Sequence, residues 1–120
     1  MQLPKPKVDA VGLFEELTPE GRGVTSKKMF GQPAAFVNGN LFFGVFGDRI
    51  FLRLSEEDRA EAARTSGFVP FEPMPGRPMR AYLVVPEVIL RDRARCRKWV
   101  ARSMDFVSRM PPKTTQSKGK

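Results

Sequence analysis

The residue types that most often carry catalysis are scarce in this sequence. It contains no histidine, which is both the commonest proton shuttle near neutral pH and the commonest metal ligand. Cys96 is the single cysteine and the one conceivable nucleophile. It shares helical spacing with Val100, Ser103 and Val107, which predicts a buried thiol, although neighbouring arginines would lower the pKa of an exposed one. We therefore expect no enzyme activity, no metal and no cofactor.

Carboxylates occur in adjacent runs rather than in converging pairs. Glu15-Glu16 and Glu56-Glu57-Asp58 fall in predicted helices, where residues one apart point in different directions. Such runs are typical of a solvated face, and the second one also complements the positive end of a helix dipole. The glycines are scattered at predicted turns and match no nucleotide-binding fingerprint.

Basic residues gather toward the C-terminus. The net charge is +8, yet residues 1–90 carry eleven Lys/Arg and eleven Asp/Glu, so the excess lies in residues 91–120. Five of these cations recur at helical steps: Arg91, Arg95, Lys98, Arg102 and Arg109. A column of cations about one turn apart can contact successive phosphates or a row of acidic side chains. The alternative is a solvated face whose arginines pair with acids of the helix predicted at residues 55–66.

Two further segments could contribute to binding. Lys27 and Lys28 precede Met29, Phe30 and Gly31, and a glycine beside an aromatic residue permits close approach of a partner. The other interpretation is that Met29 and Phe30 anchor the first strand.

Trp99 allows two similar interpretations. A tryptophan beside arginines could stack on a nucleic-acid base. Its place on the apolar stripe of the last helix favours core packing instead.

Hydrophobic periodicity and turn residues predict the elements that position these groups. Asn38-Gly39 and Gly47-Asp48 are typical of tight hairpin turns, and Ser55 is typical of a helix N-cap. Helices are predicted at residues 9–17, 55–66 and 92–110, strands at 29–37, 41–46, 49–54, 68–71 and 79–85, and a Pro-rich loop at 72–78.

This pattern predicts an α+β fold in two layers, with an antiparallel sheet covered by helices on one face in the order α-β-β-β-α-β-β-α. We expect one domain at residues 9–110, a flexible N-terminus at 1–8 and a disordered basic tail at 111–120 that extends the cationic stripe. No apolar run approaches the ~20 residues needed to cross a bilayer. The single cysteine suits a reducing compartment, so we expect a cytoplasmic protein without membrane contact.

Several short segments together resemble the N-terminal domain of the TfoX (Sxy) competence regulators. They are Lys28-Met29-Phe30-Gly31, Phe36-Val37-Asn38-Gly39-Asn40-Leu41-Phe42, Ile50-Phe51-Leu52-Arg53-Leu54-Ser55, Gly67-Phe68, Gly76-Arg77-Pro78-Met79 and Lys98-Trp99-Val100. The resemblance covers roughly residues 10–108 and implies a two-layer fold similar to secretion chaperones. Full-length members are cytoplasmic positive regulators of DNA-uptake genes with a second, C-terminal helical domain, for which 120 residues leave no room. No catalytic residue follows from the resemblance.

Three hypotheses about function remain open from the sequence. The first is a non-catalytic regulatory module, acting by protein contact in transcriptional control of competence-type genes. The second is weakly selective nucleic-acid binding through the basic helix, and the third is a chaperone-like peptide binder that uses a sheet face or edge. The residues expected to contact the partner are Arg91, Arg95, Lys98, Arg102, Arg109, Lys27 and Lys28. The protein is expected to be a monomer or a homodimer.

Overall fold

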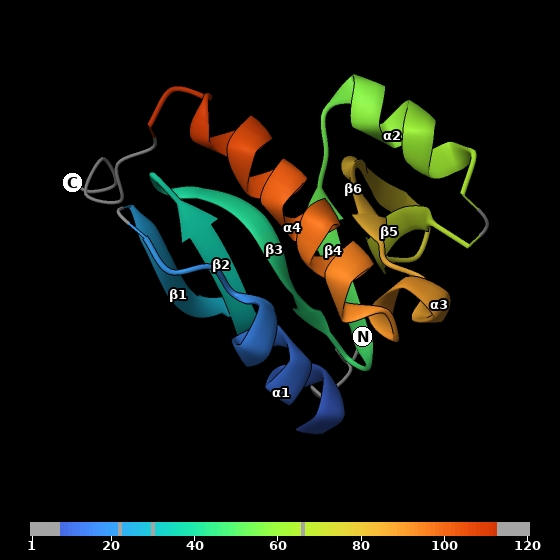
Figure 1. The fold of residues 1–120 in the computed structure, drawn as a ribbon, viewed down its shortest axis with the longest axis horizontal. Coiled ribbons are helices and arrows are strands. Elements are labelled where there is room, and N and C mark those ends of the chain that lie inside the picture. Colours follow the sequence, from blue (N-terminus) through green and yellow to red (C-terminus); the bar gives the residue numbers. More distant parts are fainter. Residues whose placement is uncertain (1–7, 22, 30, 66, 113–120) are drawn as a thin grey trace.

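Six antiparallel strands form one sheet, and four helices accompany it (Figure 1). The structure, a computed structural model, describes residues 8–112 except residues 22, 30 and 66. Its elements are α1 (Val8–Leu17), β1 (Val24–Met29), β2 (Gln32–Val37), β3 (Asn40–Phe46), β4 (Arg49–Arg53), α2 (Glu56–Ala63), β5 (Val69–Met74), β6 (Arg77–Val84), α3 (Glu87–Leu90) and α4 (Arg93–Ser108). The strand order is β1-β2-β3-β4-β6-β5.

Local signals in the sequence explain the central hairpins. Asn38 and Gly39 both have positive φ, at 54° and 83°, as a two-residue turn between β2 and β3 requires. Gly47, with φ 68°, opens the next turn into β4. The Ser55 side chain accepts a hydrogen bond from the Asp58 N–H and so caps α2. These predictions are confirmed.

The predicted α+β class and the order of helices and strands are also confirmed, with some differences in detail. Residues 29–37 are not one strand: Gly31, with φ 74°, turns the chain between β1 and β2. The predicted loop at residues 72–78 is instead the end of β5, a turn at Gly76 and the start of β6. The helix predicted to reach residue 66 ends at Ala63, and the short helix α3 was not predicted.

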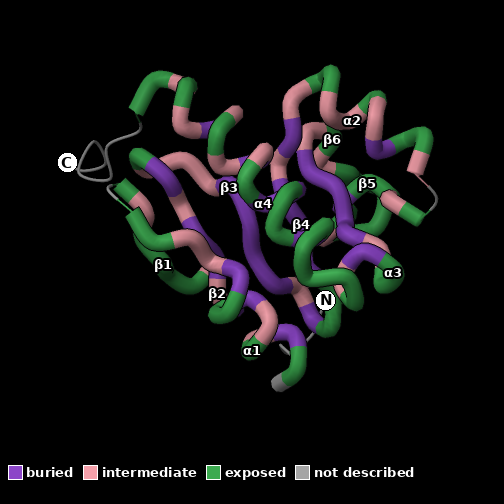
Figure 2. Tube along the Cα trace, viewed as in Figure 1, coloured by how far each residue is buried: buried purple, intermediate pink, exposed green. Residues whose placement is uncertain are grey.

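The larger hydrophobic cluster lies between the sheet and the helices. Helices α1 and α4 cross the same face of the sheet and contact β3 and β4 (Figure 1). Phe14 of α1 stacks on Phe43 of β3 at 4.9 Å between ring centroids. The central strands are the most buried part of the chain, whereas the edge strand β1 is mostly exposed (Figure 2).

A second, smaller cluster lies on the other side of the sheet. Phe51 of β4 stacks on Phe71 of β5 with ring centroids 4.2 Å apart and an interplanar angle of 6°. Met29 from the opposite edge of the sheet packs against the same cluster. Residues of both edge strands, Met29 of β1 and Phe71 of β5, therefore take part in one cluster.

Some predictions lie outside the described residues. They concern residues 1–7, Phe30 and residues 113–120, whereas Val8 begins α1. Among the helices of the described ranges, none combines the length and the apolar character needed to cross a membrane.

Candidate interaction surface on the last helix

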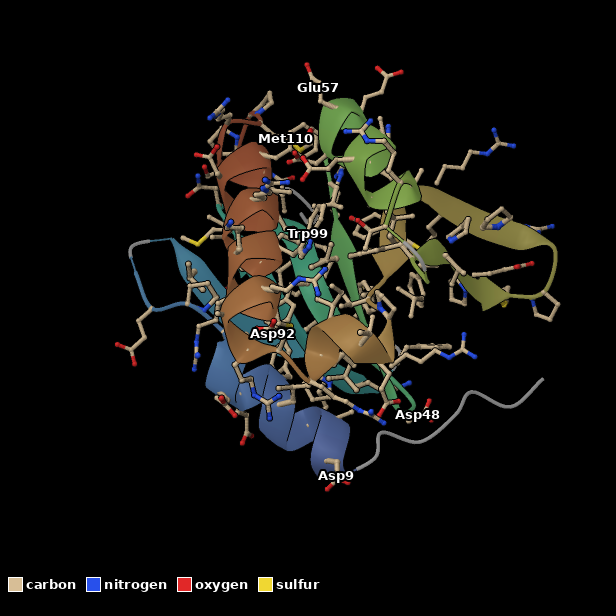
Figure 3. All side chains as sticks on the ribbon, turned by 45° about the vertical axis from the view of Figure 1, so that its right-hand side comes forward. Asp9, Asp48, Glu57, Asp92, Trp99 and Met110 are labelled. Carbon is tan, nitrogen blue, oxygen red and sulfur yellow. The ribbon has the colours of Figure 1, made fainter. Side chains whose placement is uncertain are left out.

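Helix α4 is held to the sheet by the apolar stripe that its sequence predicts. Asp92 precedes the helix and caps it, because its Oδ1 accepts a hydrogen bond from the Arg95 N–H at 3.2 Å. One face of α4 is buried, and there the Ser103 hydroxyl donates a 2.8 Å hydrogen bond to the Phe42 carbonyl of β3. Figure 3 shows the course of α4 from Asp92 past Trp99 to Met110. With one face fixed in this way, the other side chains of α4 point along its flanks or into solvent.

The predicted cationic stripe is present on α4, but its first member is not part of it. Arg95, Lys98 and Arg102 follow one another at helical spacing along one flank, and Arg109 continues that line at the C-terminal end. Arg91 instead occupies the C-cap of α3, before α4 begins. The short helix α3 interrupts the continuous column that the sequence predicted.

The C-terminal half of the stripe is neutralised within the molecule. The Arg102 guanidinium lies 2.9 Å from a Glu61 carboxylate oxygen and 3.6 Å from one of Asp58, both on α2. It also lies over the Trp99 ring, 4.8 Å from the centroid. Arg102 is therefore an internal link between α4 and α2, as the alternative interpretation of the basic face predicted.

Two other predicted cations form local ion pairs on the surface. Arg109 pairs with Asp105, and Arg91 pairs with Glu87 at 3.5 Å, each four residues apart in sequence. The Arg91 and Glu87 side chains are 78% and 74% exposed. Exposed ion pairs of this kind contribute about 0–1 kcal/mol to stability. A partner's carboxylate could therefore replace the internal one at little cost in free energy.

Arg95 and Lys98 remain exposed and unpaired. Within the described part of the chain, no carboxylate lies within ion-pair distance of either side chain. They lie three positions apart, so their Cα atoms are separated by about 5 Å along the helix axis. These two positive charges are the part of the predicted stripe that is free to contact another molecule.

A second basic flank was not singled out in the sequence. Arg93 and Arg97 lie on the other side of the buried stripe and both contact Glu16 of α1, at 3.1 and 3.3 Å. A groove of about 550 Å³ runs beside this contact, with Leu17, Val100 and further residues of α1 and α4 in its walls. The four-residue spacing of the two arginines could have identified the flank, but only the packing of α1 supplies its counter-ion.

Lys27 and Lys28 lie apart from α4, on the edge strand β1. The Lys27 ammonium lies over the Phe36 ring, 5.2 Å from its centroid, on the sheet face opposite the helices. Strand alternation directs Lys28 to the other face. The structure therefore does not join the predicted lysine pair to the cations of α4 in one surface.

The environment of Cys96 opposes nucleophilic chemistry. Its side chain is fully buried. Burial raises the pKa of Cys96 to about 11, and Arg93 and Arg97 only partly oppose that rise.

Trp99 is 6% exposed and packs against Phe68, so core packing leaves it no face for base stacking. Cys96 and Trp99 both belong to the core.

The fold and this surface describe an α+β domain with two exposed, unpaired cations on its last helix among the described residues. A comparison with protein families finds the TfoX N-terminal domain, which matches residues 15–107. The chain belongs to the TfoX N-terminal domain family. A comparison with curated proteins gives no match.

Proposed function

We propose that the protein is a non-catalytic regulatory binding module that acts by protein contact, in the cytoplasm, in the control of competence-type genes. Family membership supports the regulatory part of this proposal. The observation that supports the contact surface is the pair of unpaired, exposed cations Arg95 and Lys98 on a helix that is fixed to the core.

An acidic surface is the partner that fits these two cations. Arg102 and Glu61 next to them already neutralise each other, so the attraction is concentrated on Arg95 and Lys98. The exposed Arg91–Glu87 pair can open and add a third cation. Because the contact rests on exposed charges, salt should weaken it.

Affinity capture tests this proposal. Wild type and the double variant Arg95→Glu/Lys98→Glu are used as bait at low and high salt. A matched control, Arg49→Glu/Arg77→Glu, changes the net charge equally at two exposed cations outside α4. At low salt, we expect wild type and the control to retain one partner that the double variant does not retain. At high salt, we expect every bait to lose that partner. Equal capture by the double variant would contradict the proposal.

Direct nucleic-acid binding is a second candidate, favoured by the same two free cations. The log-log dependence of affinity on salt has a slope of about −0.9 per duplex phosphate contacted. Contact by Arg95 and Lys98 alone gives about −1.8, whereas engagement of five stripe cations gives about −4.5. Titration of duplex DNA at several salt concentrations measures this slope, and undetectable binding at low salt rules the candidate out.

Strand addition at a sheet edge is disfavoured by the composition of both edges. The edge strand β1 carries Lys27 and Lys28, and the other edge strand, β5, carries Pro70 and Pro73. Prolines lack the N–H that a pairing strand needs, and lysines oppose edge-to-edge association. A peptide partner would therefore have to bind a face rather than an edge.

A further inference from the structure

The sheet face opposite the helices carries a row of contacts that crosses five strands. In β1 and β2, the Lys27 ammonium covers the Phe36 ring. Phe36 pairs with Leu41 of β3 in the strand register. The Leu41 carbonyl accepts a 3.4 Å hydrogen bond from the Tyr82 hydroxyl of β6. Arg53 of β4 completes the row, because its guanidinium carbon lies 5.5 Å from the Tyr82 ring centroid. We call these five residues the open-face row.

Arg53 is the residue in this row with an unsatisfied polar atom. Its guanidinium lies beside the Tyr82 ring, but its Nε is buried and has no hydrogen-bond acceptor among the described residues. Across the described ranges, no carboxylate forms an ion pair with it either. Buried polar groups in folded proteins are nearly always hydrogen-bonded, and a guanidinium presents a rigid fork of donors that fits a carboxylate. Because the Nε is closed to solvent, an acceptor from outside the chain can reach it only when the partly buried Arg53 side chain turns outward from Tyr82.

The charges of the row indicate what supplies the acceptor. Its two cations, Lys27 and Arg53, stand three strands apart and are offset along them, which separates their backbones by roughly 15 Å. Between them lie the partly buried apolar side chains of Phe36 and Leu41. That distance equals about four to five residues of an extended peptide.

We propose that the open-face row binds an acidic, partly apolar segment of a protein partner, with one carboxylate on Arg53, a second on Lys27 and an apolar side chain against Leu41. This surface lies on the opposite side of the sheet from α4 and is independent of the function proposed above.

A peptide fits the row better than a nucleic acid does. Stacking of bases needs an open aromatic ring. Tyr82 is only 8% exposed, and Lys27 lies over the ring of Phe36. The row therefore offers two cations and apolar side chains, which match carboxylates and aliphatic groups.

Tyr82 is a specific reporter for this site, since it is the only tyrosine of the chain and contacts Arg53. The probe is a blocked nonapeptide with two glutamates four positions apart and leucines between them. NMR signals of the Tyr82 ring are followed during titration of the full chain with this peptide. Fluorescence of Trp99, the only tryptophan, reports whether each variant is folded.

We expect saturable shifts of the Tyr82 signals in wild type. Arg53→Met should weaken binding on the order of tenfold, because it removes charge-assisted hydrogen bonds. Arg53→Lys, which keeps the charge but loses the fork, should have an intermediate effect. Lys27→Met, at an exposed position where folding is not at risk, should weaken binding a few-fold. Arg49→Met, on the same strand, and Arg95→Glu/Lys98→Glu, on α4, should bind as wild type does.

Three results would overturn the proposal. The first is peptide binding of equal strength in wild type, Arg53→Met and Lys27→Met. The second is an unchanged Tyr82 spectrum at saturating peptide. The third is a shift of the Tyr82 NMR signals by inorganic phosphate or a single-stranded oligonucleotide at lower concentration than the peptide, with the same dependence on Arg53. That result would assign the site to phosphate groups.

Discussion

At the scale of single residues, helical spacing is enough to predict which side chains of α4 lie in the core. Cys96 and Trp99 fall on the buried stripe of α4, as helical spacing predicts. Buried polar residues are different, because each needs a particular partner. Gln32 is fully buried, and its Oε1 accepts a 2.6 Å hydrogen bond from the Gly47 N–H across the sheet. No sequence pattern predicts that contact.

Replacement of Gln32 tests the energy of this buried hydrogen bond. We expect Gln32→Leu to lower the free energy of unfolding by about 1–3 kcal/mol, because the buried Gly47 N–H loses its acceptor. Urea unfolding measures the difference. Thr18→Val is the control. It removes the hydrogen bond from the Thr18 hydroxyl to the Phe14 carbonyl, but that carbonyl still accepts a hydrogen bond from the Thr18 N–H. An unchanged urea midpoint for Gln32→Leu would contradict the assignment.

At the scale of elements, glycines have opposite roles in α1 and β3. Gly44 of β3 lies under the Phe51 ring: an added Cβ would approach the Phe51 Cζ to 2.8 Å and the Pro33 carbonyl oxygen to 3.2 Å. Phe51 itself is fixed by its stack on Phe71. At Gly12, within α1, such a Cβ would have no atom within 4 Å apart from its chain neighbours and the backbone of its own helix. The second hydrophobic cluster therefore depends on the missing side chain at Gly44, whereas α1 gains nothing from Gly12.

Two alanine substitutions separate these roles. Gly44→Ala should destabilise the protein by about 1–3 kcal/mol through displacement of Phe51. Gly12→Ala should stabilise it by up to about 1 kcal/mol, because alanine favours the helix. Thermal unfolding of both variants measures the two signs. If both substitutions shift the melting temperature in the same direction, the close approach at Gly44 is not what constrains that position.

Elements also decide which cations are free. Arg102 meets Asp58 and Glu61 because the chain places α2 beside the C-terminal half of α4. Arg95 and Lys98, one to two turns earlier, have no such neighbour in the part of the chain that the structure describes. The candidate surface is thus defined as much by the position of α2 as by the sequence of α4.

At the scale of the whole molecule, two buried titratable groups link stability to alkaline pH. Burial raises the pKa of Tyr82 above its ordinary value against the opposing effect of Arg53, and burial raises the pKa of Cys96 to about 11. The unfolded chain releases both protons first, so it binds fewer protons than the folded chain at alkaline pH. The stability that these groups contribute is complete below pH ~9 and is lost as pH rises through their folded pKa values.

We therefore expect the free energy of unfolding to fall between pH 9 and about pH 11, with the thiol accounting for on the order of 2 kcal/mol. Urea unfolding at a series of pH values measures the decline. Cys96→Ala should be less stable at neutral pH, because it leaves a small cavity, but should lose less stability over this range. An equally steep decline in Cys96→Ala would show that the Cys96 thiol titrates alike in folded and unfolded chains.

Local backbone preferences and the spacing of apolar residues are enough to predict the α+β class, the turn at Asn38-Gly39 and the apolar stripe of α4. The main differences in element boundaries lie at two glycines. The sequence predicts an interrupted strand at Gly31 and a loop at Gly76, whereas both are turns between paired strands.

Which charges are free depends on how the helices pack in three dimensions. Glu61 and Arg102 are forty-one positions apart, and Glu16 and Arg97 eighty-one, so no local pattern could pair them. The alternation of Arg49 and Arg53 with apolar residues predicted their face of the sheet. It did not predict that folding would place Tyr82 of β6 beside the Arg53 guanidinium. Ion pairing and burial depend on groups that folding brings together from distant segments, and such contacts leave no periodic trace in the sequence.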